Sequence, residues 1–129
     1  MIYLDSSALL KLVVRQPESA ALLRFLESHA ERVSSAIARV EVLRAVRRMP
    51  RSVDLLDRAE RVLERVALVP VDDEVLANAA RVDPIAVPPL DAIHLATALT
   101  LPLLDAFVAY DAHVLQGAIQ LGCEVVSPR

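Results

Sequence analysis

The amino-acid sequence predicts a three-layer α/β/α sandwich built around a central parallel sheet of about five strands. Short apolar runs of β type alternate along the chain with longer helical patterns, and strands separated by helices form right-handed crossovers in a parallel sheet. The chain has 129 residues, of which 55% are hydrophobic and only 3% aromatic, so its core consists mainly of aliphatic side chains. A chain of this length buries one good core, and we expect a single domain over residues 1–129.

The first half of the chain opens with a strand and continues mainly with helices. Residues 2–4 are a compact apolar run, and Ser6 or Ser7 supplies an N-cap for the helix that follows. Pro17 is suited to the first turn of the second helix, and Pro50 ends the third. The elements expected here are a strand at 2–4, a helix at 8–14, a helix from 17 to about 30, a strand at 33–36, a helix ending near 48 and a helix at 55–66.

The second half repeats this alternation. The run at 68–71 predicts a strand near an edge of the sheet, because Pro70 has no N–H to donate to a neighbouring strand. Asp72 or Asp73 caps the next helix, and a stiff proline-rich loop then precedes a helix that begins at Asp91. The elements expected here are a strand at 68–71, a helix ending near 82, a helix at 91–99, a strand at 106–109, a helix beginning at 111 and a strand at 124–126.

Four acidic residues stand where this fold would collect them. Asp5 and Asp111 follow strands, Asp91 begins a helix after the proline loop, and Glu41 lies about one turn into another helix. Ligands of open parallel sheets bind outside the carboxyl ends of the strands. Two carboxylates about 5 Å apart repel by roughly 3 kcal/mol at an effective dielectric near 20, so the cluster requires protons or a cation. Oxygen-only ligands suit Mg²⁺ or Mn²⁺, which predicts metal-dependent phosphodiester hydrolysis.

Each acid also has a structural interpretation. Asp91 and Asp111 stand at helix starts, where an aspartate ordinarily caps the helix. Glu41 can pair with Arg44 on the surface of its helix. Asp5 is harder to explain in this way, because it ends a buried strand, where an unpaired charge is costly. The combination of all four is therefore more specific than any one of them.

Composition and charge narrow the class of partner. The formal net charge is −3, but setting the four candidate acids aside leaves 13 of the 17 acidic residues against 14 basic ones, so net charge is a weak argument against nucleic acid. Two Phe and two Tyr are too few for a platform on which single-stranded bases stack. No apolar run approaches the roughly 18 residues of a membrane span, and the one cysteine excludes an intrachain disulfide. We expect a cytoplasmic protein with no membrane partner.

Four ordered motifs resemble those of PIN-domain proteins, in particular the VapC-type toxins of bacterial toxin–antitoxin pairs. Residues 1–11 (MIYLDSSALLK) are similar to the opening of these proteins, and residues 34–47 are similar to their second motif. Residues 90–99 (LDAIHLATAL) match the third motif, and residues 107–111 (FVAYD) fit the fourth. The resemblance spans essentially the whole chain.

This resemblance implies a PIN-like fold and a magnesium-dependent ribonuclease that is inhibited by a cognate antitoxin and is often homodimeric. It carries metal ligation onto Asp5 and Asp91, with Glu41 and Asp111 completing the acidic set. Ser7 matches a hydroxyl position that supports the metal site or contacts phosphate, and a plain helix cap is an equal alternative for it. The implied cofactor is Mg²⁺ or Mn²⁺, and the implied partners are an RNA substrate and the antitoxin.

Other residues qualify this picture. Ala109 stands where the family often has a threonine. The missing hydroxyl bears on the hydrogen bonds that support the metal ligands, and not on metal binding itself. His94 is interpreted as a histidine satisfied at the edge of the core in preference to a metal ligand. The basic segment containing Arg39, Arg44 and Arg48 predicts contact with an RNA backbone, although part of it can instead complement a helix C-terminus.

Two further segments bear on protein partners. The helical segments at 8–14 and 22–26 carry small and aliphatic side chains, which can leave an apolar groove for an amphipathic helix of the antitoxin. Arg58, Arg61 and Arg65 alternate with acidic residues and predict a solvated ion-pair face. The sequence contains no recognisable seam for a homodimer.

The leading hypothesis is thus a toxin-type endoribonuclease that uses Mg²⁺ or Mn²⁺ at the four carboxylates. A catalytically silent PIN-like module that mainly binds a partner protein is the alternative. A phospho-receiver domain shares the doubly wound sheet but fits poorly, because serines follow Asp5 where a second acid is needed. Lys11 is also the only lysine in the chain, so the lysine that a receiver carries near its end is missing.

Overall fold

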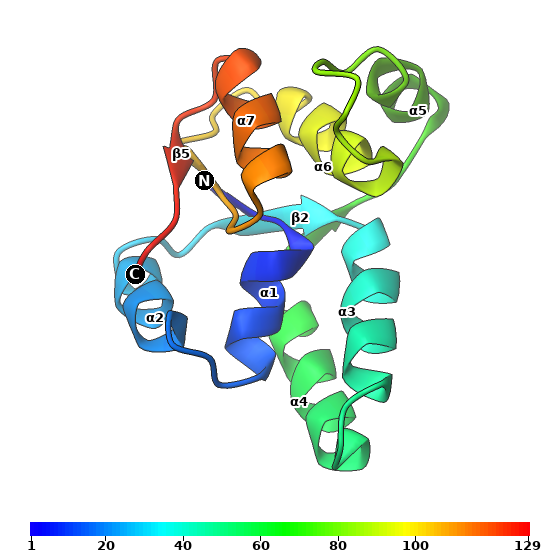
Figure 1. The fold of residues 1–129 in the computed structure, drawn as a ribbon. Coiled ribbons are helices and arrows are strands. Elements are labelled where there is room, and N and C mark those ends of the chain that lie inside the picture. The colour runs from blue at the N-terminus through cyan, green and yellow to red at the C-terminus, as the bar shows by residue number, and fades with distance from the viewer.

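The computed structural model describes residues 1–129 and contains one five-stranded parallel sheet with helices on both faces (Figure 1). The strand order is β3-β2-β1-β4-β5, and every neighbouring pair is parallel. The strands are β1 (Ile2–Leu4), β2 (Arg32–Ser35), β3 (Ala67–Val69), β4 (Ala106–Val108) and β5 (Val125–Val126). The helices are α1 (Ser6–Val13), α2 (Ser19–Glu27), α3 (Ile37–Arg47), α4 (Ser52–Glu64), α5 (Asp73–Ala79), α6 (Pro89–Leu99) and α7 (Ala112–Gln120). This architecture confirms the predicted α/β/α sandwich.

The pleat of the strands divides the core into two apolar layers. Ile2 and Leu4 of β1 pack with α1 to α4 on one face of the sheet, while Tyr3 between them packs with α6 and α7 on the other. β4 alternates in the same way, and the ring of its Phe107 stacks on Tyr3 with centroids 4.8 Å apart. Because both faces are covered, β1 and β4 are apolar at every position, which is the continuous pattern that the sequence shows.

The strand order places the ends of β1 and β4 at a topological switch point. From β1 the chain moves outward through β2 to β3, and it then returns to the other side of β1 to form β4 and β5. Leu4 and Val108, the last residues of β1 and β4, are paired, and Asp5 N donates a hydrogen bond to Val108 O at 3.1 Å. The crevice outside the carboxyl ends of strands at such a point is where ligands bind.

Several helix starts differ from the sequence prediction, and at α1 and α6 the reason is local. The prediction that Ser6 or Ser7 caps α1 is wrong. Asp5 has the extended backbone of an N-cap, and its carboxylate accepts a hydrogen bond from Ala8 N at 2.9 Å. The helix expected to begin at the third-motif aspartate begins two residues earlier, at Pro89, because a proline in the first turn loses no hydrogen bond.

Other boundaries follow the prediction more closely. β3 is the edge strand that the sequence indicated, and it ends at Val69, before Pro70. Asp72 is the residue that caps α5, which ends at Ala79 and so is shorter than expected. α2 begins at Ser19, just after the proline that was expected to open it. None of the helices is both long and apolar enough to cross a membrane.

Candidate active site

The four acidic residues come from four elements that meet near the carboxyl edge of the sheet. Asp5 follows β1, Glu41 lies in the second turn of α3, Asp91 lies in the first turn of α6, and Asp111 is the N-cap of α7. Burial is the main reason that the pKa values of Asp5 and Asp91 are raised, and nearby negative charge adds to it. Asp91 acts on the pKa of Asp5, while Asp111 and Glu41 act on the pKa of Asp91. The fold thus gathers the four carboxyl groups into one electrostatic neighbourhood.

Asp5 is the most deeply placed of the four. Only 3% of its surface is exposed, and burial raises the pKa of its carboxyl group to about 6 despite hydrogen bonds that act in the opposite direction. Those bonds come from Ser7 Oγ at 2.6 Å and Ala8 N at 2.9 Å, and both reach Oδ1. Oδ2 has no partner in the protein and is not sealed from solvent. One oxygen therefore fixes the side chain while the other stays available.

Asp91 and Asp111 lie farther out. Asp91 is half-buried, and no hydrogen bond from the protein contributes to its raised pKa. The side chain of Asp111 is 53% exposed, and its Oδ1 accepts hydrogen bonds from His113 N at 2.9 Å and Val114 N at 3.3 Å. Asp111 is therefore a helix cap, as its structural interpretation held, and it also contributes charge to the site.

Glu41 is held by two polar side chains from other helices. Its Oε1 lies 2.7 Å from Ser6 Oγ and 2.6 Å from His94 Nε2. Burial acts to raise the pKa of Glu41, but the hydrogen bond and charge of His94 and the hydrogen bond from Ser6 outweigh it, so the net shift is downward. The surface pair with Arg44 that the sequence allowed is not formed, because Glu41 pairs with His94 instead.

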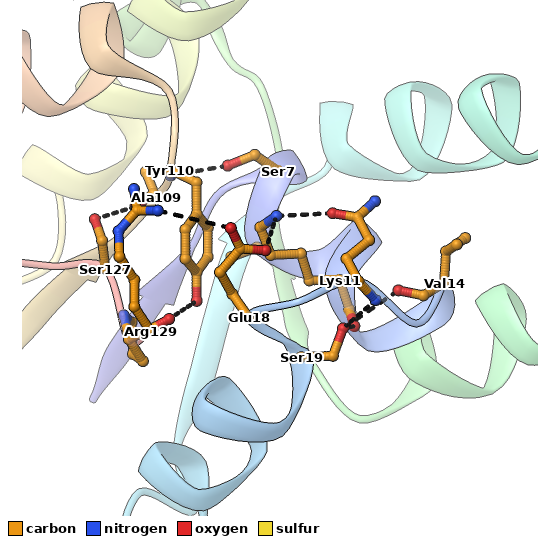
Figure 2. Close-up of polar contacts among 12 residues, drawn as sticks. Ser7, Lys11, Val14, Glu18, Ser19, Ala109, Tyr110, Ser127 and Arg129 are labelled. Carbon is orange, nitrogen blue, oxygen red and sulfur yellow. Dashed lines mark hydrogen bonds and ion pairs between the residues drawn. The ribbon is translucent and has the colours of Figure 1, made fainter.

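Ser7 connects two parts of the site. Its hydroxyl donates to Asp5 Oδ1 at 2.6 Å and accepts a hydrogen bond from Tyr110 N at 3.2 Å (Figure 2). The Tyr110 ring in turn lies under Lys11 Nζ, 4.6 Å from the ring centroid, and Lys11 pairs with Glu18 at 2.9 Å. The proton of Ser7 is thus used inside the site, where it orients Asp5.

The C-terminal segment holds the residues that precede Asp111. Ala109, where the family often has a threonine, is fully buried, and its carbonyl oxygen accepts a hydrogen bond from Ser127 Oγ at 2.6 Å. Tyr110 Oη donates to the carbonyl oxygen of Pro128 at 2.9 Å (Figure 2). Backbone and tail contacts therefore fix this loop without a side-chain hydroxyl at position 109.

The donor chemistry of the cluster fits a hydrated divalent ion. No group of three or more His, Cys, Asp or Glu side chains is arranged to hold a metal ion directly. Mg²⁺ usually keeps several waters and needs only one or two protein carboxylates, whereas Zn²⁺ and Ca²⁺ sites take more ligands from the protein. Asp5 and Asp91 offer oxygens that are free of protein hydrogen bonds. Burial in the first place, and neighbouring negative charge in the second, raise their pKa values, and a bound cation would offset both effects.

The basic segment of α3 is divided between two roles. Arg44, Arg47 and Arg48 are exposed and line a recess of about 210 Å³. Arg39 lies outside it and forms an ion pair with Glu60 of α4, with Nη1 2.9 Å from Oε2 and 3.2 Å from Oε1. Two of the three arginines named from the sequence thus share an arginine-lined surface with Arg47, and the third is neutralised.

The fold and the gathered acids define an α/β/α sandwich with an acidic cluster, formed by Asp5, Glu41, Asp91 and Asp111, at the switch point of its sheet. Residues 2–104 match the model of the PIN domain family, and the chain belongs to that family.

Known proteins extend this assignment over the whole chain. The chain is 45% identical to ribonuclease VapC46 of Mycobacterium tuberculosis, an alignment that covers 98% of this chain and 97% of that protein. The fold is similar to that of VapBC2 from Rickettsia felis bound to a fragment of promoter DNA, with a TM-score of 0.80, 12% identity and complete coverage of both chains. It is also similar to VapC20 of M. tuberculosis, described as a toxin that cleaves the sarcin–ricin loop, with a TM-score of 0.76, 18% identity and coverage of 99% and 100%.

Proposed function

We propose that this chain is the toxin of a VapBC-type pair, an endoribonuclease that hydrolyses RNA phosphodiester bonds at the acidic cluster with Mg²⁺ or Mn²⁺. The observation that carries the proposal is the convergence of Asp5, Glu41, Asp91 and Asp111, from four elements, at the switch point of a PIN fold. The 45% identity to a protein named a ribonuclease supports the same reaction.

Asp5 and Asp91 would hold the ion, because their free oxygens and raised pKa values suit a cation. When bound, a divalent ion supplies polarisation of the phosphoryl group and stabilisation of the leaving oxygen. Ser7 keeps Asp5 in one orientation through its 2.6 Å hydrogen bond, so the carboxylate does not have to reorganise.

Glu41 and Asp111 would act on water. The pKa of Glu41 is lowered, so its side chain is a carboxylate at neutral pH and can accept a hydrogen bond from the attacking water. Asp111 stands at the exposed rim, where its second oxygen can bind ordered water. Water then displaces a ribose oxygen in line at phosphorus.

The recess lined by Arg44, Arg47 and Arg48 would bind the RNA backbone beside the acidic cluster. Arg44 and Arg48 lie three and seven residues after Glu41 on α3, so all three share one side of the helix. At about 1.5 Å of rise per residue, the Cα atoms of Arg44 and Arg48 lie roughly 4 and 11 Å along the helix axis from the Cα atom of Glu41. When an RNA strand lies at the acidic cluster, the phosphates next to the cleaved one would reach these two guanidinium groups.

The experiment that tests the function is RNA cleavage with and without EDTA by the wild type, Asp5→Asn and Asp72→Asn. Asp72 caps α5 and forms no part of the site, so its variant is the matched control. We expect EDTA or Asp5→Asn to abolish cleavage and Asp72→Asn to retain it. Full activity in folded Asp5→Asn, purified free of host nucleases, would refute the assignment.

A second candidate is a catalytically silent PIN-like module. The absence of a preformed group of three metal-binding side chains is the observation in its favour. Calorimetry at millimolar Mg²⁺ separates the two candidates, because a silent module that binds no divalent ion gives no heat while the proposed enzyme does. Metal-dependent RNA cleavage would count against the silent module.

The proposed partner is an antitoxin that binds a groove lined mainly by α1, α2 and α4. Four apolar and four basic residues line this groove of about 390 Å³; they are Leu12, Leu23, Val62, Val66, Arg32, Arg58, Arg61 and Arg65. The sequence predicted an apolar groove at the helices that carry Leu12 and Leu23. An amphipathic helix with an acidic flank has the matching chemistry.

The antitoxin proposal is tested by co-expression with the protein encoded beside the toxin gene. Leu23→Glu places a charge among the apolar side chains of the groove and should prevent co-purification, whereas Ile119→Glu, on the exposed side of α7, should not. A chain that expresses harmlessly alone and co-purifies with no neighbouring gene product contradicts the pairing. We also propose a homodimer, which sedimentation at several concentrations tests.

A further inference from the structure

His94 lies at the centre of a chain of hydrogen bonds that runs from Tyr3 in the core to Glu41 in the acidic cluster. The residue is on α6 and only 1% exposed. Its Nε2 lies 2.6 Å from Glu41 Oε1 and 3.1 Å from Ser6 Oγ, and its Nδ1 lies 2.7 Å from Tyr3 Oη. One imidazole therefore connects β1, α1 and α3, three elements that surround the switch point.

The direction of these hydrogen bonds follows from the partners. Glu41 is a carboxylate, because its pKa is lowered, and a carboxylate only accepts. Nε2 must therefore carry a proton and donate it to Oε1. The hydroxyl of Tyr3 can donate as well as accept, so its 2.7 Å contact with Nδ1 is a hydrogen bond whether or not that nitrogen carries a proton. Both nitrogens are thus committed to the protein, which leaves neither of them for a metal ion.

The ring itself is held rigidly. Tyr3 meets His94 edge-on, with centroids 5.9 Å apart, and Tyr3 is stacked on Phe107 of β4. All three side chains are fully buried. A donor whose position is set by the sheet can fix the direction of the group that it bonds to, at little cost in side-chain entropy.

We infer that His94 is a positioning residue for Glu41. It fixes Oε1 through a hydrogen bond from Nε2–H, and it leaves Oε2 free to accept a hydrogen bond from the attacking water. Ser6 shares this task, since its hydroxyl donates to the same oxygen at 2.7 Å. The inference rests on the proposed ribonuclease function. A histidine that only filled the core would not need a partner in the site, whereas this one makes its shortest contact to a site residue.

The first test compares His94→Gln, His94→Leu and Leu95→Met with the wild type in steady-state RNA cleavage. A glutamine amide can reach the Nε2 position and still donate to Glu41, and a leucine cannot. Leu95 is the control, because it is equally buried on α6 but has no polar atom and packs toward Gly117 of α7, and methionine fills nearly the same volume.

We expect His94→Leu to lower kcat by about 10-fold to 100-fold, the usual cost of losing an orienting partner, with KM little changed. His94→Gln should recover most of that loss, and Leu95→Met should match the wild type. Wild-type kcat in folded His94→Leu, or a His94→Gln variant as impaired as His94→Leu, would overturn the inference.

A second readout needs neither RNA nor metal. The ¹⁵N chemical shifts of the His94 ring in the free protein should show a protonated Nε2, and Glu41→Gln should shift the Nε2 signal. A proton on Nδ1 alone, or a spectrum unchanged in Glu41→Gln, would also overturn it. If the wild type cleaves no RNA, the proposed function fails by itself, while the ring spectrum still decides whether His94 holds Glu41.

Discussion

Asp5→Asn should make the protein more stable at neutral pH while it abolishes activity. The substitution keeps the oxygen that accepts hydrogen bonds from Ser7 and Ala8 and removes only the charge. That charge is unfavourable in the folded protein, because Asp5 is 3% exposed and its pKa is raised from 3.8 to about 6, chiefly by burial. The expected gain is a direct consequence of burying a carboxylate at the edge of the sheet.

The size of the gain depends on pH. Because the folded-state pKa is raised, the folded protein holds the proton of Asp5 more tightly than the unfolded chain does. The associated stability is fully present below a pH of about 3.8 and is lost as the pH rises through about 6. One pKa unit corresponds to about 1.36 kcal/mol. Asp5→Asn should therefore raise the free energy of unfolding by about 3 kcal/mol at a pH of about 7.5, and by about 1 kcal/mol at a pH of about 4.5.

Urea unfolding in EDTA, followed by circular dichroism at both pH values, measures this difference. Asp72→Asn is the matched control, because asparagine caps a helix about as well as aspartate does and Asp72 is exposed. Saturating Mg²⁺ should then stabilise the wild type, by about 2.7 kcal/mol at 100 times the dissociation constant, and leave Asp5→Asn unchanged.

Two results would refute the reasoning. One is an Asp5→Asn protein that is no more stable than the wild type at pH values near neutrality. The other is a stabilisation of equal size at both pH values, since a gain that does not depend on protonation cannot come from the charge of Asp5.

Two further predictions follow from the contacts of the site. Ser7→Ala removes a hydrogen bond that lowers the pKa of Asp5, so the acid limb of the pH–rate profile should move to higher pH and kcat should fall by about 10-fold or more; an unchanged profile would mean that Ser7 does not orient Asp5. Arg44→Gln and Arg48→Gln should each weaken RNA binding and reduce the salt slope by about 0.7, whereas Arg39→Gln, already paired with Glu60, should have little effect in the same titration.

The order of elements and the placement of the acids could be predicted from the sequence. Asp5 and Asp111 directly follow apolar runs, and the carboxyl ends of parallel strands share an edge, so their convergence follows from the topology alone. The identity of the α1 cap did not follow, because Asp5, Ser6 and Ser7 are all good caps. Only the backbone conformation, extended at Asp5 and helical from Ser6, decides among them.

Contacts between helices were beyond the sequence. Glu41 was assigned a neighbour on its own helix, whereas its partner His94 is 53 positions away on α6. Arg39 pairs with Glu60 for the same reason, since the α3–α4 hairpin aligns residues 21 positions apart. The spacing of Asp91 and His94 by three residues was the one available signal, because it places both on nearly the same helix face.

The basic residues of α4 were interpreted from their neighbours in sequence. Their alternation with acids predicted an ion-pair face, and one such pair exists, with Arg61 Nη1 3.2 Å from Asp57 Oδ2. All three arginines, Arg58, Arg61 and Arg65, also line the groove beside α1 and α2. Local charge patterning cannot reveal this arrangement, because the groove is made by helices that come together only in the fold.

The bond from Tyr110 to Ser7 has a practical consequence for work on this protein. Tyr110 also bonds to Pro128, and its ring lies 5.9 Å from the Arg129 guanidinium on one side and 4.6 Å from the Lys11 ammonium on the other. A disturbance at Pro128 thus reaches Asp5 through two side chains. An affinity tag fused next to these last residues risks lowering catalytic activity while the protein still purifies and folds normally.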